Sequence, residues 1–301
     1  MKRENAVKHV HDPCLIRHQD HYFLFSTGHG IPIRRSHDLK EWEMLGRVFE
    51  EDVPAWAKEE IPGTVFPWAP DIAFFNGKYH LYYSVSTFGK NRSLIGLATN
   101  PTLNPMEKHY KWTNEGKVFE SFPTSDFNAI DSHVFAYARG KMIFTVGSFW
   151  TGIKAVELDP KTGKPVPGAP VKSLAQRERP GAIEAPFLTK KGQFYYLFLS
   201  FDTCCQGVRS TYNIRVGRSK DIWGPYTDRD GKELRQGGGT PVLATEGSRI
   251  GPGHCAVLEE RGKHLPVCHY YDATDKGVST LMIRPLEWDN EMWPQPGPLL
   301  L

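Results

Sequence analysis

Five ionisable residues recur at similar intervals along the chain, each at the start of a short apolar run. They are Asp12, Asp71, Asp131, Glu184 and His254, and successive members lie 53 to 70 residues apart. Two carboxyl groups with different pKa values can divide acid–base work, because the protonated group donates a proton while the ionised group accepts one or attacks carbon. If the fold gathers these five residues, their mutual repulsion favours a catalytic or ion-binding site over a passive scaffold.

Two of the carboxyls have surroundings that suit such a division. Glu184 lies in the apolar sequence AIEAP, where desolvation raises the pKa of a carboxyl and suits a general acid. Asp12 lies between His11 and Pro13, a more polar setting that suits an ionised base. A third acid nearby can keep the pKa of the general acid high. One acid that protonates a leaving oxygen and one base that activates water are the groups that hydrolyse a glycosidic bond.

The elements that would position these residues are β-hairpins. Aromatic and β-branched runs at 21–27, 78–86, 141–149, 193–201 and 263–271 each follow a polar turn, such as NGK or RGK, and are typical of second strands. The corresponding first strands are DPCLI, DIAFF, DSHVF, EAPFL and HCAVL, which begin at the five ionisable residues. A repeat of about sixty residues fits a four-stranded propeller blade. We therefore predict an all-β protein, a five-bladed β-propeller, formed as one domain by residues 1–301.

A propeller would bring the five positions together, because the innermost strand of every blade lines the central channel. The alternative is that these side chains cap strand ends or join blades by hydrogen bonds. That alternative is reasonable for any one acid and weaker for five residues in phase.

Composition excludes several other classes of protein. With 40% hydrophobic and 24% charged residues in 301, the chain can form a core and is not disordered. The net charge of +3 is scattered, so we expect neither nucleic acid nor a membrane surface as a partner, and no run of about 20 apolar residues predicts a membrane span. A closed propeller leaves no strand edge that requires a partner, so we expect a monomer.

Cellular compartment stays open at this stage. The sequence MKRENAVKHVHDP has no apolar segment of a signal peptide. The protein is either secreted or periplasmic with its signal peptide absent from this chain, or cytoplasmic. Five cysteines with one vicinal pair match neither a disulfide framework nor a zinc motif, so they do not decide the redox environment.

The motifs, in their order and spacing, resemble family 43 glycoside hydrolases, with the arabinan-degrading members nearest. The segments that carry this resemblance are HDPCLI, WAPDIAFFNGKYHLYYSVSTFG, NAIDSHVF, RPGAIEAPFL, FDTCCQGVRSTYNIRVGRS and GPGHCAVL. The resemblance covers residues 9 to 295 and implies a five-bladed propeller that hydrolyses α-1,5-linked L-arabinofuranose chains with inversion.

The same resemblance implies a role for each central residue. Asp12 is expected to be the general base, Glu184 the general acid, and Asp131 the acid that orients Glu184 and adjusts its pKa. An inverting enzyme needs the base and acid carboxyls about 6.5–9.5 Å apart. His254 is expected to face one Ca²⁺ at the propeller axis, mostly through waters, since calcium prefers oxygen ligands. The alternative for His254 is a buried histidine with satisfied hydrogen bonds.

Substrate contacts are expected at the mouth of the channel. Trp68, Phe88 and Trp150 lie at strand ends, where their rings could stack on sugar faces or, alternatively, belong to the core. The resemblance implies that Asp71 lies near the site and holds substrate hydroxyls, and that the vicinal pair Cys204 and Cys205 marks a loop near the substrate groove. Arg215 could pair with an axial carboxylate or lie on the surface.

Two features depart from the family pattern. Only eleven residues precede Asp12, which puts closure of the propeller by an N-terminal strand in doubt and makes the C-terminal WPQPGPLLL segment a candidate for that role. Ser132 stands where proline is common.

Endo-acting α-1,5-L-arabinanase is our leading interpretation. An exo-acting arabinanase, an α-L-arabinofuranosidase, a β-xylosidase and a non-catalytic binding propeller are the alternatives.

Overall fold

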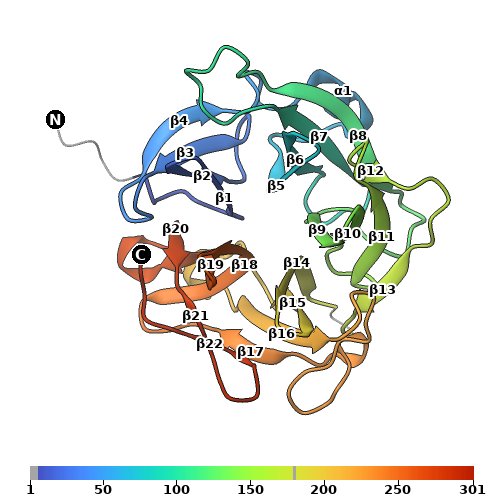
Figure 1. Ribbon diagram of the computed structural model, residues 1–301, viewed down its shortest axis with the longest axis vertical. Coiled ribbons are helices and arrows are strands. Elements are labelled where there is room, and N and C mark those ends of the chain that lie inside the picture. The colour runs from blue at the N-terminus through green and yellow to red at the C-terminus, as the bar shows by residue number, and fades with distance from the viewer. Residues whose placement is uncertain (1–5, 179–180) are drawn as a thin grey trace.

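Five antiparallel sheets surround one central axis, like the blades of a propeller (Figure 1). This computed structural model describes residues 6–178 and 181–301. The prediction of an all-β, five-bladed propeller is confirmed. The innermost strands of blades 1 to 5 are β1 (Cys14–His18), β5 (Trp68–Phe75), β9 (His133–Ala138), β14 (Ile183–Lys191) and β18 (Arg249–Glu260).

The later strands follow outward in chain order. Blade 1 adds β2 (His21–Phe25), β3 (Pro32–Ser36) and β4 (Glu43–Arg47), and blade 2 adds β6 (Lys78–Val85), β7 (Ser93–Asn100) and β8 (Thr113–Ser121). Blade 3 adds β10 (Lys141–Val146), β11 (Ile153–Asp159), β12 (Lys164–Pro165) and β13 (Lys172–Ala175). Blade 4 adds β15 (Phe194–Phe201), β16 (Asn213–Ser219) and β17 (Thr240–Leu243), and blade 5 adds β19 (Lys263–Asp272) and β20 (Val278–Ile283).

Little other regular structure is present in the described chain. A separate hairpin pairs β21 (Leu286–Trp288) with β22 (Pro294–Pro296), and α1 (Ala55–Glu60) is a short helix between blades 1 and 2. None of the described helices has the length and apolar character needed to cross a membrane.

The predicted hairpin between β5 and β6 illustrates why the blades form. Asn76 and Gly77 both have positive φ, 48° and 75°, which is the conformation of a two-residue type I′ turn. This turn fixes the register, so Phe75 pairs with Lys78 and every second side chain of the strands faces an adjacent blade.

Hydrophobic side chains fill each interface between neighbouring blades. One cluster joins Phe25 of blade 1 to Leu81 of blade 2, and four further clusters join the remaining pairs of neighbours, including blade 5 with blade 1. A fully buried leucine or phenylalanine contributes about 1.5–3 kcal/mol. Five apolar interfaces therefore stabilise the ring and hold the innermost strands around the axis.

In every blade, one non-glycine residue in or just before the innermost strand gives the backbone a left-handed turn. The residues are Asp12, Ala69, Asp131, Ala185 and His254, with φ between 43° and 59°. Each donates its N–H to a side chain of the preceding blade, in the order His269, Thr27, Ser84, Asp131 and Ser200. Such backbone strain costs about 1–3 kcal/mol per residue, and one hydrogen bond offsets about 0.5–1.5 kcal/mol of it. We call these five contacts the seam hydrogen bonds.

Both ends of the described chain meet on β20. Leu281 N–H donates to Val7 O at 2.8 Å, and Ile283 N–H donates to Leu301 O at 2.9 Å. The doubt about an N-terminal closing strand is thus resolved, because the short segment before Asp12 pairs with blade 5. The C-terminal segment continues the same edge.

Candidate active site

The five left-handed residues mark equivalent positions in the five blades. Comparison of the predicted site residues with these positions corrects one prediction. Asp12, Asp131 and His254 occupy equivalent positions, as expected. Asp71 lies two residues after its blade's left-handed residue, and Glu184 lies one residue before its own. The prediction that all five residues are in phase was therefore wrong. Spacing alone could not locate the register shifts, which lie between Trp68 and Asp71 and just after Glu184.

Asp12 is held from several directions. Its Oδ2 accepts a hydrogen bond from the Thr27 hydroxyl at 2.6 Å, and its Oδ1 lies 2.9 Å from Nδ1 of His11. Nδ1 of His254 is 3.4 Å from the same oxygen. Thr27 also accepts the seam hydrogen bond from Ala69, so blade 2 fixes the hydroxyl that orients Asp12.

These contacts keep Asp12 ionised. Burial alone would raise its pKa, but His11 and then His254 hold the pKa of this carboxyl well below its usual range. Burial likewise opposes the charge on His11, yet the Asp12 carboxylate raises the His11 pKa to about 10. Asp12 and His11 therefore form an ion pair at neutral pH, and Asp12 is available as a proton acceptor.

Glu184 has the opposite character. It is buried at the start of β14, and burial raises its pKa. Two hydroxyls oppose this effect, since Ser148 donates to Oε2 and Tyr212 donates to Oε1, both at 2.7 Å. These donors fix the carboxyl in one orientation. Its pKa nevertheless stays above that of an exposed glutamate, so it holds its proton to higher pH.

Asp131 is electrostatically linked to Glu184. Burial raises the pKa of Asp131 well above its usual value, and repulsion first from Glu184 and then from Asp12 raises it further. The Ala185 N–H donates to the Asp131 carboxyl and opposes the shift. Two buried carboxyls that repel each other cannot both ionise readily, so the pair retains a proton near neutral pH.

His254 occupies the axial position predicted for it. Its side chain is 13% exposed and lies beside Asp12, and burial lowers its pKa, although Asp12 opposes this. Its imidazole is therefore neutral at pH 7 and has a nitrogen lone pair to offer. A cation near the axis would also be attracted by the carboxylate of Asp12.

The enclosed part of the axis is too small for a hydrated ion. A cavity of about 10 Å³ lies there, and its lining includes Asp71, Asp131, Ser132, His133 and His254. Among the described residues, Ser132 Oγ and His133 Nε2 are buried there without a hydrogen-bond partner. These polar atoms and this volume suit about one water molecule. Calcium with six to eight oxygen ligands does not fit inside the cavity, so only the partly exposed side of His254 could face it.

Another group near Asp12 has spacing suited to a metal. Ligand atoms of His11, Asp12 and His269 lie within 4.8 Å of one another. The two imidazole rings, however, stack 3.8 Å apart with 27° between their planes, so their in-plane lone pairs do not converge on one ion. Nδ1 of His269 already accepts the Asp12 N–H. The geometry describes a hydrogen-bonded network around Asp12.

Asp71 lies in the interface between blades 2 and 3. Its Oδ2 accepts the Val134 N–H at 3.0 Å and is 3.1 Å from Nδ1 of His133. The carboxyl lines the axial cavity, but these contacts engage one of its oxygens inside the propeller. Asp71 therefore joins two neighbouring blades by hydrogen bonds, which is the structural alternative considered above for each acid.

Of the three aromatic candidates, Trp68 and Phe88 both belong to blade 2. Trp68 is half-buried and pairs with Ser84, the residue that accepts the seam hydrogen bond from Asp131. Phe88 is 82% exposed in the loop after β6. Trp68 therefore lies next to the carboxyl site, whereas Phe88 projects from the surrounding rim.

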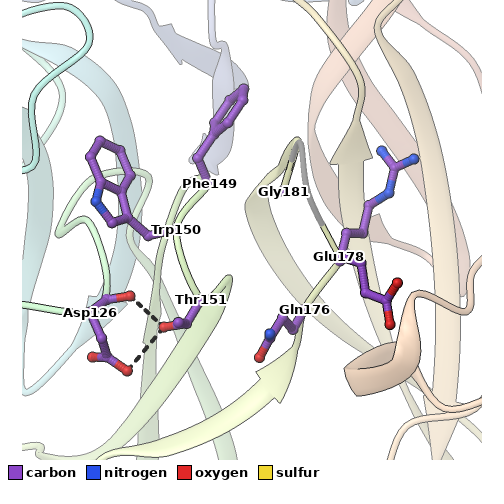
Figure 2. Close-up of a pocket in the computed structure, with 8 residues that line it drawn as sticks. Asp126, Phe149, Trp150, Thr151, Gln176, Glu178 and Gly181 are labelled. Atoms are coloured by element: carbon purple, nitrogen blue, oxygen red, sulfur yellow. Dashed lines mark hydrogen bonds between the residues drawn. The ribbon is translucent and has the colours of Figure 1, made fainter.

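Trp150 lines a pocket of about 970 Å³ between blades 3 and 4 (Figure 2). Its lining includes Asp126, Phe149, Trp150, Gln176, Arg177 and Glu178. The pocket adjoins Glu184, because the Phe149 N–H donates to Ile183 O at 2.8 Å and Ser148 contacts the Glu184 carboxyl. An indole that is 41% exposed at this position is available to a ligand.

The vicinal cysteines lie beside the ion pair of Asp12. The sulfur atoms of Cys204 and Cys205 are 2.7 Å apart, and Cys205 Sγ is 3.9 Å from Nε2 of His11. Cys204 lowers the pKa of Cys205 to about 5, against the effect of burial, and His11 adds to this. The predicted loop therefore does reach the site.

Arg215 belongs elsewhere. Its guanidinium donates to Asn213 Oδ1 at 3.0 Å and to Gly239 O at 3.3 Å, and it lies over the ring of Phe201. These partners are all in blade 4. The suggested pairing with an axial carboxylate was wrong, because the side chain follows the blade away from the axis.

Sequence reasoning missed the residues that surround the carboxyls. Ser148 and Tyr212 bind Glu184, while Thr27, His269 and Tyr271 belong to the network around Asp12. Thr27 and Tyr212 lie in the same blade as their partner but on other strands or loops, and Ser148, His269 and Tyr271 lie in a neighbouring blade, so no local motif links them to their partners. The sequence did contain a signal for the equivalent positions of the blades. Proline follows the left-handed residue in HDP, WAP and EAP.

A propeller whose axis gathers one ionised carboxylate and a pair of buried, proton-retaining carboxyls has the equipment of a glycoside hydrolase. The chain belongs to glycosyl hydrolases family 43, whose profile matches residues 5–294. It is 42% identical to the extracellular exo-α-(1→5)-L-arabinofuranosidase ArbA of Cellvibrio japonicus, over 95% of this chain and 86% of the relative. It is 39% identical to the extracellular endo-α-(1→5)-L-arabinanase 1 of Bacillus subtilis, over 95% and 87%.

Solved structures agree with this assignment. The structure of a Cellvibrio cellulosa α-L-arabinanase complexed with arabinohexaose superposes with a TM-score of 0.93 at 40% identity, covering 97% of this chain and 96% of that one. The predicted family is confirmed, and the protein is a glycoside hydrolase.

Proposed function

We propose that this protein, as one catalytic propeller domain, hydrolyses α-1,5-linked L-arabinofuranosyl bonds of arabinan with inversion. The observation that carries the proposal is the contrast between ionised Asp12, paired with His11, and buried Glu184, whose pKa is raised. Relatives whose names specify α-(1→5)-arabinan chemistry, and an arabinohexaose complex of a similar structure, support the choice of substrate.

Each carboxyl has one task in the proposed reaction. Asp12 accepts a proton from a water molecule, which attacks the anomeric carbon from the face opposite the leaving oxygen. Glu184 donates its proton to that oxygen as the glycosidic bond breaks. Asp131 shares the buried site with Glu184, so the two carboxyls cannot both ionise readily, and it accepts the Ala185 N–H, which holds the backbone next to Glu184.

Substrate would lie across the mouth of the axis. The pocket lined by Trp150 lies on the Glu184 side, where the leaving part of the chain would be placed. We assign to Trp68, which pairs with Ser84, a contact with the sugar at the carboxyls. The size of this pocket favours several sugar residues over one, and on that basis we propose endo cleavage as the main mode.

An exo mode is the second candidate. One of the two relatives described above is named as an exo enzyme and the other as an endo enzyme, at similar identity. The two modes differ in whether loops close one end of the groove.

A time course of products from linear debranched α-1,5-arabinan tests the reaction and its mode, with Glu184→Gln and Asp12→Asn as controls. We expect a ladder of oligosaccharides, and a loss of kcat of about 10²- to 10⁴-fold in each variant. Arabinose or a single short product alone would indicate exo action. Full activity in either variant would remove that residue from the mechanism, and no release from arabinan would contradict the substrate.

We also propose that a Ca²⁺ ion binds on the partly exposed side of His254, chiefly through waters. The neutral imidazole of His254 and the nearby Asp12 carboxylate support this position. When bound, the ion would supply positive charge near the reacting water. Thermal denaturation with EDTA and with added CaCl₂ should differ in the native protein and coincide in His254→Ala. Identical melting curves in the native protein would contradict a bound ion.

A further inference from the structure

We propose that Tyr271 is a positioning residue that holds Asp12 in its working orientation and couples it to the loop of Cys204 and Cys205. This inference rests on the proposed role of Asp12 as general base. Tyr271 does not touch the carboxylate itself, and its effect would pass through two histidines.

The Tyr271 hydroxyl is a meeting point of three groups. It accepts the Cys205 N–H at 2.7 Å, and Nε2 of His11 and of His269 lie 2.8 Å and 3.4 Å from it. Tyr271 is 4% exposed, and burial first, then Cys205, raise its pKa. It therefore remains a neutral hydroxyl at neutral pH, anchored on β19 of blade 5.

The two histidines transmit this anchoring to Asp12. Nδ1 of His11 contacts the carboxylate at 2.9 Å, while Nδ1 of His269 accepts the Asp12 N–H at 3.1 Å. The two rings stack 3.8 Å apart, so neither can turn without disturbing the other. One hydroxyl thus constrains both the side chain and the left-handed backbone of Asp12.

Loss of the hydroxyl would act mainly on the chemical step. His11 would keep its contact with Asp12 but lose the hydrogen bond on its other nitrogen, so the carboxylate could rotate away from the attacking water. A misplacement of about 1 Å can cost about 10² in rate. The loop would persist, because Thr211 N–H donates to Thr203 O and Gln206 N–H donates to the Ser210 hydroxyl. Substrate affinity would then change little.

Kinetics of Tyr271→Phe on linear debranched α-1,5-arabinan test the inference. We expect kcat to fall about 10- to 100-fold while KM stays within twofold. Tyr195→Phe is the matched control, since it removes a hydroxyl whose contact is Tyr137 O in the neighbouring blade, and it should keep both constants. Circular dichroism and melting curves measure the folded fraction of every variant. A Tyr271→Phe protein that is folded and has native kcat would overturn the inference.

A double-mutant cycle separates positioning from general stability. Because Tyr271 acts through His11 as well as His269, the double variant Tyr271→Phe/His11→Gln should lose less activity than the product of the two single losses. Multiplicative losses would overturn the proposed route. Should Tyr271→Phe not fold, His11→Gln at its partly exposed position tests the same contact, and native kcat in that variant would also overturn it.

Asp12→Asn, measured in parallel, distinguishes failure of the general-base role of Asp12 from failure of the positioning role of Tyr271. Activity retained in Asp12→Asn would refute the general base and, with it, this inference. An inactive Asp12→Asn together with a fully active Tyr271→Phe would refute only the positioning role.

Discussion

The ionisation of Glu184 is set by opposing contacts. Burial raises its pKa, whereas the hydroxyls of Ser148 and Tyr212 lower it by binding the carboxylate form. The residue therefore lies between two extremes: a fully desolvated acid that could not release its proton, and an exposed glutamate that would have lost it. An acid that must give up a proton and regain it in each turnover needs this intermediate position.

Removal of either hydroxyl should shift the pH dependence of activity. In Ser148→Ala or Tyr212→Phe the carboxylate loses a donor, so the pKa of Glu184 rises further. Because a general acid works only when protonated, the alkaline limb of kcat/KM should move to higher pH in both variants. Rate profiles between pH 4 and pH 10 measure this, with Tyr195→Phe as a control. A limb that stays in place or moves to lower pH would contradict Glu184 as the acid.

At the scale of the strand, one glycine determines where Tyr212 lies. A Cβ on Gly253 of β18 would be 1.8 Å from the Tyr212 ring, and that ring is buried. The close approach of blade 5 to Tyr212 thus sets the hydroxyl that binds Glu184.

Gly253→Ala should therefore displace Tyr212, lowering kcat at least tenfold and stability by about 1–3 kcal/mol. Gly96→Ala is a matched control, since its Cβ would meet the buried ring of Tyr83, whose contacts are remote from the carboxyls. The control should lose stability but keep its kcat per folded molecule. Equal kcat in the two folded variants would show that the Gly253 contact has no catalytic consequence.

In blade 3, Ser132 stands at the position that proline occupies in three other blades. It follows a left-handed residue, as Pro13, Pro70 and Pro186 do in blades 1, 2 and 4, and its hydroxyl is buried without a partner among the described residues. Ser132→Pro should raise the free energy of unfolding by about 0.4–1 kcal/mol through the unfolded chain, and by a further amount of about 1–3 kcal/mol when no water in the axial cavity binds the hydroxyl.

Chemical denaturation of Ser132→Pro and Ser132→Ala separates these two contributions. The alanine variant removes the hydroxyl alone, and the proline variant also restricts the backbone. Destabilisation in both variants would mean that the hydroxyl has a partner in solution, such as a water in the axial cavity.

Elements were more predictable than contacts. Turn signals and aromatic runs located five hairpins, because hairpins are local structures. The phase of Asp12, Asp131 and His254 followed from the repeat. Asp71 and Glu184 were misjudged because a register shift moves a side chain without changing the repeat length. The partners of Asp12 could not be found, since His269 and Tyr271 reach it only after blade 5 has met blade 1, and Thr27 reaches it from a loop after β2 that no motif marks.

For the whole molecule, closure on β20 adds to the stability that the five apolar interfaces provide. Leu300 and Leu301 pack on the hydrophobic cluster between blades 5 and 1, and Leu301 O accepts the Ile283 N–H. Deletion of residues 299–301 should lower the melting temperature by a few degrees, with kcat at 25 °C unchanged, because the carboxyls lie at the starts of innermost strands. Leu299→Ser, at an exposed position, is the control. A large loss of kcat in the folded deletion variant would show that closure also shapes the site.

The meeting of residues 7 and 301 on β20 has a further consequence. Residues 7 and 301 are neighbours of one strand, so a linker could join the two segments while a new opening is made in an exposed turn such as 139–140. Such a circular permutant would start at a different blade yet keep every seam hydrogen bond and every carboxyl in place. The catalytic arrangement depends on the cyclic order of the blades, and any of the five could come first.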